Sequence, residues 1–314
     1  MSLHNTTDLC FIVSSVRSGS TFLRLMLNSH PHISNPGECD FLFDLVEKDG
    51  SLPNTPSYVK WLASNRIFLA KKLNIQATLS SKELIYSFVD QMRHGDSLLT
   101  MNIHRNFYRI PFIFPNARFI HLQRDPRDVA NSCIGMGWAG HVYYGVDIWQ
   151  EAEESWMKLR SMLKPNQYLE IRYEDIVSSV ESNLSVICKF LGLEYSDLMM
   201  SYLSTSTYAA PDKNLCFQWK RKLSPRELQL LEGKLHFKLD EIGYEPSGYD
   251  PAKPGLLEKL KLVLINKIYK FRFQKQRYGL GLTIEIFLAN KTGIDSWQMA
   301  CRKRKNRIDI KHLK

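Results

Sequence analysis

A short polar loop lies between an apolar run and an apolar-periodic segment in "FIVSSVRSGSTFLRLMLNSHP", residues 11–31. The run 11–13 predicts a buried strand, and the apolar spacing in 22–27 predicts a helix. Between them, residues 17–21 supply one arginine, one glycine and three hydroxyl groups. Such a junction holds phosphate in many α/β proteins, because free N–H groups and the helix dipole converge there. The feature predicts an α/β fold with an anion-binding loop.

A second junction of this kind follows later in the chain. Three further runs are predicted to be strands: residues 97–103, 117–123 and 167–176. The segment "RDPRDVANS", Arg124–Ser132, comes directly after the second of them, with Asp125 as a helix N-cap and Pro126 in the first helical position. Strands that alternate with helices predict a parallel sheet flanked by helices, with both loops at one crevice beyond the carboxyl ends of the strands.

The composition is that of an ordinary globular protein, with 44% hydrophobic and 24% charged residues among 314. The first residues lack the pattern of a signal peptide, and no uninterrupted apolar run reaches about 18 residues, so we expect a cytoplasmic protein without a membrane span. The six cysteines are scattered, which favours free buried thiols, and the histidines show no ligand spacing, so no metal is expected.

The charge is unevenly distributed along the chain. Residues 251–314 contain 16 Lys and Arg against 4 Asp and Glu, whereas residues 1–250 contain 26 against 28. We therefore predict a catalytic domain over 1–250 and a basic, mainly helical C-terminal extension over 251–314.

The first loop is not a nucleotide-triphosphate loop. That motif, G-x-x-x-x-G-K-S/T, places a lysine directly after its second glycine. Here Ser20 follows Gly19, and the basic residue Arg17 precedes it. The same physics still applies, because Gly19 permits close backbone approach and Arg17 offers a fixed fork of donors to an oxyanion. The alternative is a solvated helix cap with a surface arginine.

Several motifs in order carry a family resemblance. They are "RSGST", the "HP" about ten residues later, Gly37-Glu38, "RDPRDVANS", "RYEDI" and "FLGL". Together, from about Phe11 to Leu223, they resemble the sulfotransferases that use 3′-phosphoadenylyl sulfate (PAPS), most closely the branch of bacterial carbohydrate, heparan-type and tyrosylprotein sulfotransferases. The resemblance implies a parallel α/β sheet related to that of nucleotide kinases, a P-loop-kinase-like sulfotransferase fold.

The resemblance also implies a donor site, with adenosine 3′,5′-bisphosphate (PAP) as the product and no metal. The residues that would bind the 5′-phosphosulfate are Arg17, Ser18, Gly19, Ser20 and Thr21, and Arg17 would also face the sulfuryl group. Arg124 and Ser132, eight residues apart, would bind the 3′-phosphate; the alternative is a local ion pair between Arg124 and Asp125. Tyr173 would lie near the adenine or in the core. Lys220 and Arg221 belong to a late basic segment near the cofactor.

Two residues compete as the base that removes the proton of the acceptor hydroxyl. Glu38 matches the glutamate of the heparan and tyrosylprotein branches, and His104 lies where the cytosolic branch has its catalytic histidine; we favour Glu38. The structural alternatives are a helix-starting carboxylate and a polar surface histidine. Many relatives have a lysine at the position of Asn102, so its role would pass to His104, Arg105 or Arg17.

The predicted function is sulfuryl transfer to a hydroxyl acceptor, most simply a carbohydrate or glycolipid, held by loops such as 133–144 and 58–72. The rivals are a kinase-like phosphotransferase and a non-catalytic polyanion-binding module. The basic extension fits a membrane-surface helix, a sleeve for an acidic acceptor, a nucleic-acid patch or a helix packed on the body. Nothing resembles a nucleic-acid fold, and we favour an anionic lipid surface or a polyanionic glycan.

Overall fold

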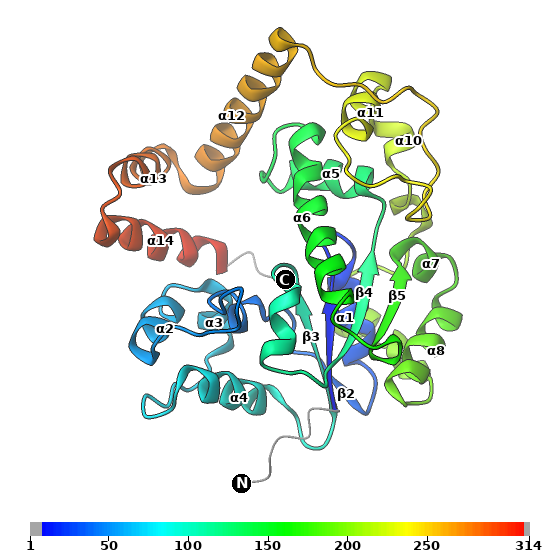
Figure 1. Ribbon diagram of the computed structural model, residues 1–314, viewed down its shortest axis with the longest axis vertical. Helices are drawn as coiled ribbons and strands as arrows, with labels where there is room; N and C mark the ends of the chain where they lie inside the picture. Colours follow the sequence, from blue (N-terminus) through cyan, green and yellow to red (C-terminus); the bar gives the residue numbers. More distant parts are fainter. Residues whose placement is uncertain (1–7, 311–314) are drawn as a thin grey trace.

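The computed structural model describes residues 8–310 and is built on one five-stranded, all-parallel sheet in the order β2-β3-β1-β4-β5 (Figure 1). The strands are β1 (Leu9–Val13), β2 (Ile33–Ser34), β3 (Leu98–Ile103), β4 (Arg118–Gln123) and β5 (Tyr168–Arg172). β1 lies at the centre, where Phe11 is in register with Met101 of β3 and Phe119 of β4. The predicted parallel sheet flanked by helices is confirmed.

Helices cover both faces of this sheet, and the residues of β1 alternate between the two. Leu9, Phe11 and Val13 face one core, with residues of α4 and α6, whereas Cys10 and Ile12 face the other, with residues of α1, α7 and α8. All five are buried, as expected for a parallel strand covered on both sides.

The body, residues 8–250, contains eleven of the described α-helices. They are α1 (Ser20–Asn28), α2 (Thr55–Leu62), α3 (Arg66–Lys71), α4 (Ser81–Met92), α5 (Pro126–Gly135), α6 (Val142–Arg160), α7 (Tyr173–Ser178), α8 (Val180–Leu191), α9 (Tyr202–Thr205), α10 (Trp219–Lys222) and α11 (Pro225–Glu232). The N-cap of α5 is Asp125, as predicted, and its side chain accepts from the Arg127 N–H.

The sequence prediction was wrong at several boundaries. The strand expected over 167–176 ends at Arg172, because Tyr173 begins α7. The two-residue strand β2 was not predicted, since it exists only through its pairing with β3. All six cysteines are free, as expected, and all but Cys216 are buried.

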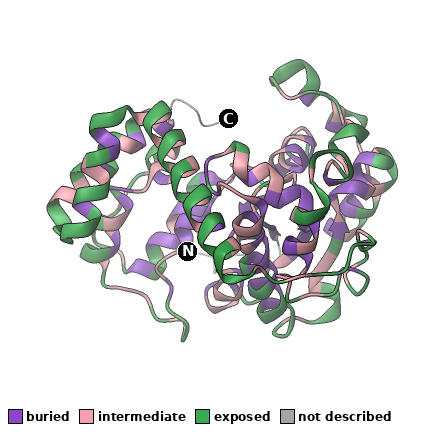
Figure 2. Cartoon of the chain, turned by 90° about the horizontal axis from the view of Figure 1, so that it is seen from above, coloured by how far each residue is buried: buried purple, intermediate pink, exposed green. Residues whose placement is uncertain are grey.

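The residues from 251 to 310, which we call the C-terminal arm, form α12 (Leu256–Tyr278), α13 (Leu280–Thr292) and α14 (Asp295–Ile310). The arm leaves the body beyond α11 and turns back, so that α14 lies over α2 and α3 (Figure 1). Its helices are largely exposed (Figure 2). No described helix is long and apolar enough to cross a membrane. The helical extension is therefore confirmed, whereas the division at residue 250 stays a prediction.

The arm is held on the body by the ion pair of Glu258 with Arg226 of α11, at 2.6 Å, and by contacts near the crevice. The Asn266 Oδ1 of α12 accepts from the Gly140 N–H at 2.6 Å, and the Phe273 ring covers Gly137, where a Cβ would fall 2.1 Å from the ring. The Asn306 Nδ2 of α14 donates to the Ser64 carbonyl at 2.6 Å and is buried. The arm thus connects the α5–α6 loop with the α2–α3 loop, across the carboxyl edge of the sheet.

Candidate active site

The loop between β1 and α1 presents backbone donors to the crevice. Arg17 and Gly19 have φ angles of 70° and 91°, which turn the chain sharply into α1. Within residues 8–310, no side chain caps the N-terminus of α1, and its first turn has no acidic residue. The Ser18 Oγ is buried and has no hydrogen-bond partner among these residues. An anion fits here, because it would accept from this hydroxyl and from the first N–H groups of the helix.

Tyr173 supports this loop from below. A Cβ on Gly19 would fall 2.3 Å from the Tyr173 Cδ2, so only glycine lets the ring and the loop approach this closely. The Tyr173 ring packs edge-on against Phe22, and burial raises the pKa of its hydroxyl to about 12. The Arg124 guanidinium lies 4.5 Å above the ring centre. The structure therefore places Tyr173 in the core beneath the loop, in contact with both predicted anion sites.

The two strand-to-helix junctions meet in this crevice. The Arg17 Nε donates to the Ser132 Oγ of α5 at 2.9 Å, and the Arg124 Nη1 donates to the Arg17 carbonyl at 2.9 Å. The Arg124 Nη2 donates to the Leu215 carbonyl, while its buried Nε has no described partner. The local ion-pair partner of Arg124 is Asp128, whose Oδ2 lies 3.7 Å from the Arg124 Nη2, and not Asp125. Residues 115 positions apart thus build one cationic site.

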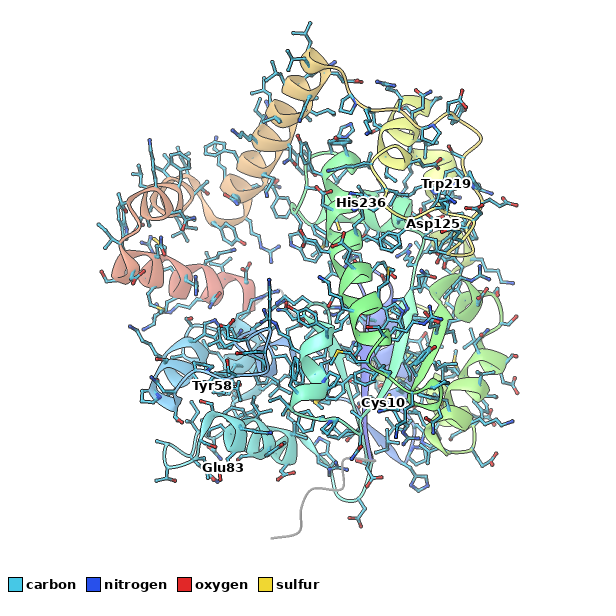
Figure 3. The ribbon with its side chains drawn as sticks, in the orientation of Figure 1. Cys10, Tyr58, Glu83, Asp125, Trp219 and His236 are labelled. Carbon is cyan, nitrogen blue, oxygen red and sulfur yellow. The ribbon has the colours of Figure 1, made fainter. Side chains whose placement is uncertain are left out.

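Asp125 instead joins a buried support under α5 (Figure 3). Its carboxylate accepts two bonds from the Arg127 guanidinium, at 2.9 and 2.7 Å, and one from the Trp219 Nε1 at 2.9 Å. Arg127 also pairs with Glu232 at 2.9 Å and stacks 3.6 Å from the Trp219 ring centre. The sequence analysis missed Arg127 and Glu232; the only signal was a second arginine inside "RDPRD". This cluster fixes the start of α5, and hence the position of Ser132.

The late basic segment points away from the loop. Lys220 is exposed and lies 3.8 Å from Glu245, and the Arg221 guanidinium donates to the Asn214 carbonyl at 2.7 Å. No described hydrogen bond or ion pair joins either residue to residues 17–21. Their assignment to the cofactor stays a prediction.

The two candidate bases are neighbours. The backbone of Glu38 pairs with Asn102 in a parallel bridge, and the Glu38 Oε1 lies 3.9 Å from the His104 Nε2. His104 is buried, and its Nδ1 lies 3.1 Å from the Ser14 carbonyl. When Nδ1 carries the proton of the neutral ring and donates it to this carbonyl, Nε2 is a hydrogen-bond acceptor. The Glu38 side chain is 41% exposed, so it is the partner that solvent and an acceptor reach.

Asn102, where the family resemblance led us to expect a lysine, is part of a buried amide network. Its Nδ2 donates to the Ser20 carbonyl at 3.1 Å, and its Oδ1 accepts from the Asn35 Nδ2 at 3.2 Å. It therefore holds the first turn of α1 against β3. Arg105, one candidate for the missing cation, is bound by both carboxylate oxygens of Asp44 at 2.6 and 2.7 Å. Among the three candidates for the role of the lysine, Arg17 lies within the loop itself.

A cavity of about 1040 Å³ opens beside these residues. Its walls include Arg17 and Glu38, together with parts of both loops that the sequence predicted as acceptor walls, among them Trp61 and Trp138. A second hollow of about 620 Å³ shares Glu38 and contains His104. Among residues 8–310, no group of three or more His, Cys, Asp or Glu side chains could hold a metal ion.

Comparison with known proteins places the chain in a family. A model of the sulfotransferase family matches residues 10–197, which contain both loops and both candidate bases. The chain belongs to the sulfotransferase family, and the prediction of a PAPS-dependent sulfotransferase is confirmed at that level.

Two relatives differ in their acceptors. A Caenorhabditis briggsae protein named among the protein-tyrosine sulfotransferases is 26% identical over 216 residues, covering 64% of this chain and 71% of the relative. The omega-hydroxy-beta-dihydromenaquinone-9 sulfotransferase of Mycobacterium tuberculosis is 28% identical over 198 residues, covering 55% of this chain and 48% of the relative. The names of these relatives therefore do not support the predicted carbohydrate acceptor.

A solved structure shows the same fold. The sulfotransferase domain of the Synechococcus PCC 7002 olefin synthase superposes with a TM-score of 0.56 and 22% identity, covering 71% of this chain and 93% of that domain.

Proposed function

We propose that this chain transfers the sulfuryl group of PAPS to a hydroxyl group of a carbohydrate or glycolipid by direct in-line displacement. The observation that carries this proposal is the contact between the two junctions, in which Arg17 donates to Ser132 and Arg124 donates to Arg17. Two anion-binding positions side by side suit a nucleotide that has phosphates at both its 5′ and 3′ positions. The binding of PAPS as the donor, and the release of PAP after the sulfuryl group has been transferred, are parts of the proposal.

The roles follow from the placement of each side chain. Residues 17–21 and the N-terminus of α1 would bind the 5′-phosphosulfate, while Arg124 and Ser132 would bind the 3′-phosphate. When the S–O bond to the phosphate breaks, negative charge develops on the leaving phosphate oxygen, and Arg17 with the loop N–H groups would stabilise it. Preorganised donors are effective because they need no rearrangement during the reaction.

Glu38 is the base in this proposal. It would take the proton of the acceptor hydroxyl as the new S–O bond forms, and the exposed carboxylate borders the same cavity as Arg17. The neighbouring His104 borders the same site, because its Nε2 lies 3.9 Å from the Glu38 carboxylate. His104 as the base is the competing assignment.

Contact with an anionic membrane surface is a further part of the proposal. The outward face of α12 exposes an unpartnered apolar stripe at helical spacing: Leu257, Leu260, Leu264, Ile268 and Phe271, from 43% to 81% exposed. Lysines flank the stripe, and the segment 251–314 has 16 Lys and Arg against 4 Asp and Glu, so the net positive charge of the chain lies in this segment. Apolar side chains bordered by cations suit the interface of a bilayer with anionic lipids. A cytoplasmic, peripheral location stays a prediction.

Vesicle sedimentation tests this surface. The chain should sediment with phosphatidylcholine vesicles that contain phosphatidylserine, less so as salt increases, and L260E/L264E should remain in solution. Equal binding of the variant and the wild type would contradict the proposal.

The donor site is tested by ligand stabilisation and turnover. PAP should raise the melting temperature more than ATP does; a ligand at a hundred times its Kd adds about 2.7 kcal/mol. A larger shift with ATP would favour a kinase-like phosphotransferase instead. Transfer of radiolabelled sulfate from PAPS to a panel of glycans then separates an enzyme from a non-catalytic polyanion-binding module, which would bind PAP or glycans without turnover.

A further inference from the structure

The C-terminal arm contributes one wall of the cavity that contains the candidate base. Four residues of α14, at positions 302, 305, 306 and 309, lie on one helical face and line the same cavity as Arg17 and Glu38. Asn306 and Asp309 are buried and anchor this face: Asn306 binds the Ser64 carbonyl, and Asp309 accepts from the Arg277 Nε at 2.9 Å and the Tyr278 hydroxyl at 3.0 Å. Arg302 and Lys305 complete the same face.

The cavity is strongly positive. Eight Lys and Arg side chains line it against three carboxylates. Two of these carboxylates, Asp44 and Asp309, already have arginine partners in Arg105 and Arg277. Arginines that pair with carboxylates add no net charge to the wall, so the excess comes from the other cations.

Among the cavity cations without an ion pair in residues 8–310, three lie on the arm or on α3, the helix that α14 contacts. Arg66 at the start of α3, and Arg302 and Lys305 of α14, form no ion pair within residues 8–310. Arg66 lies close enough to Tyr278 to lower the pKa of that hydroxyl, although burial raises it overall to about 12. Lys305 lies 5.6 Å from the centre of the same ring. Arg66 and Lys305 therefore lie near the same ring, and Arg302 is on the same face of α14 as Lys305. All three line this cavity, whereas residues 124 and 132 do not.

We infer that Arg66, Arg302 and Lys305 form a subsite for a negatively charged group on the acceptor, the carboxylate or sulfate of an acidic glycan. This inference rests on the proposed sulfuryl transfer and specifies its acceptor. Bound this way, an acidic glycan has its anionic group under the arm and a hydroxyl of a neighbouring sugar beside Glu38. The aromatic side chains of Trp61, Trp138 and Phe273, which line the same cavity, offer flat surfaces to sugar rings.

The arm therefore acts as a determinant of specificity. A neutral sugar would leave three cations near one another without compensation, whereas an acidic sugar compensates them. The family match ends at residue 197, so the two cations of α14 belong to a segment outside it.

The test compares two probes that differ only in charge: an unsulfated chondroitin tetrasaccharide and the same tetrasaccharide with its carboxylates reduced to alcohols. Binding is measured by calorimetry on the PAP-loaded full chain. R302Q/K305Q removes two cations from the cavity, and K303Q/R307Q removes two from the exposed opposite face of α14 as a control. The two variants have the same net charge, so a difference between them reports on the cavity.

We expect the wild type and the control variant to bind the acidic tetrasaccharide roughly tenfold more tightly than its reduced form. R302Q/K305Q should lose that preference while its affinity for PAP and for the reduced form is unchanged. Equal binding of both probes by the wild type, or equal losses in both variants, would overturn the subsite. A chain that does not bind PAP would instead refute the proposed function, and the PAP measurement alone shows this.

Discussion

The two ends of this molecule are built in different ways. In the body, the sheet lies between two buried cores, and the anion-binding loop is fixed by Tyr173, Asn102 and Arg124. The C-terminal arm buries few of its side chains and contacts the body at Gly137, Gly140, Ser64 and Arg226. This difference predicts that donor binding and acceptor choice are separable: changes in the loops should alter the first, and changes in the arm should alter the second.

The largest expected effect is on the base. Glu38→Gln keeps the shape of the side chain but removes its basicity, so it should reduce kcat by about a hundredfold to ten-thousandfold while the Kd for PAP stays the same. Rapid-quench turnover and calorimetry measure the two quantities. His104→Gln should lower kcat only modestly. A dead His104→Gln beside an active Glu38→Gln would make the histidine the base.

The next largest effect is a loss of stability when Gly19, in the loop of the body, is replaced. Gly19→Ala places a Cβ against Tyr173 and also imposes an alanine at a φ of 91°, so it should destabilise the fold by roughly 3 kcal/mol. Gly248→Ala is the matched control, because its φ is 85° and no atom lies within 4 Å of the added Cβ; it should cost about 1 kcal/mol. Denaturant unfolding compares them. Equal losses would mean that Tyr173 does not crowd the loop.

A substitution in the C-terminal arm should loosen the docking of the arm without changing the binding of PAP. Asn306→Ala removes the buried donor to the Ser64 carbonyl and should cost about 1–3 kcal/mol of arm docking. Hydrogen exchange of α14 should rise, while the Kd for PAP stays at the wild-type value. A weaker Kd for PAP would show that the arm and the donor site are coupled after all.

The smallest effect concerns pH. Burial raises the pKa of the Glu174 carboxyl from 4.5 to about 7, and its oxygens accept from the Asp125 N–H and the Tyr244 hydroxyl. Because the folded state holds this proton more tightly than the unfolded state, the free energy of unfolding should fall as pH rises from about 4.5 to about 7 and then level off. Glu174→Gln should remove this part of the pH dependence. An unchanged slope in the melting temperatures would contradict it.

The sequence predicted the features that depend on local pattern. The strand–loop–helix junctions at Arg17 and Arg124 were found because apolar runs, glycine and N-cap residues act over a few positions. β2 was missed because two residues carry no periodicity. Tyr173 was included in the predicted strand, because its packing against Gly19 leaves no signal in the local sequence. Such packing joins positions far apart in the chain.

The arrangement of the arm was also beyond the sequence. Its apolar and basic residues fit both an exposed and a packed helix, and α12 has one face of each kind: Asn266 and Phe273 contact the body, while Leu260 and Leu264 face outward. Only the fold shows that α14 reaches the cavity beside Glu38. A charge count could locate the cations in the chain, but not in the site.

The central claim is that Arg124 recognises a 3′-phosphate, and one set of calorimetric titrations tests it directly. PAP and AMP, which lacks the 3′-phosphate, are titrated into the wild type and into Arg124→Ala. We predict that the wild type binds PAP about ten- to a hundredfold more tightly than AMP, and that the variant loses most of this difference. Its affinity for AMP should fall by a smaller factor than its affinity for PAP, because Arg124 also donates to the Arg17 carbonyl of the loop. Equal affinities of the wild type for PAP and AMP, or equal losses for both ligands in the variant, would contradict the account.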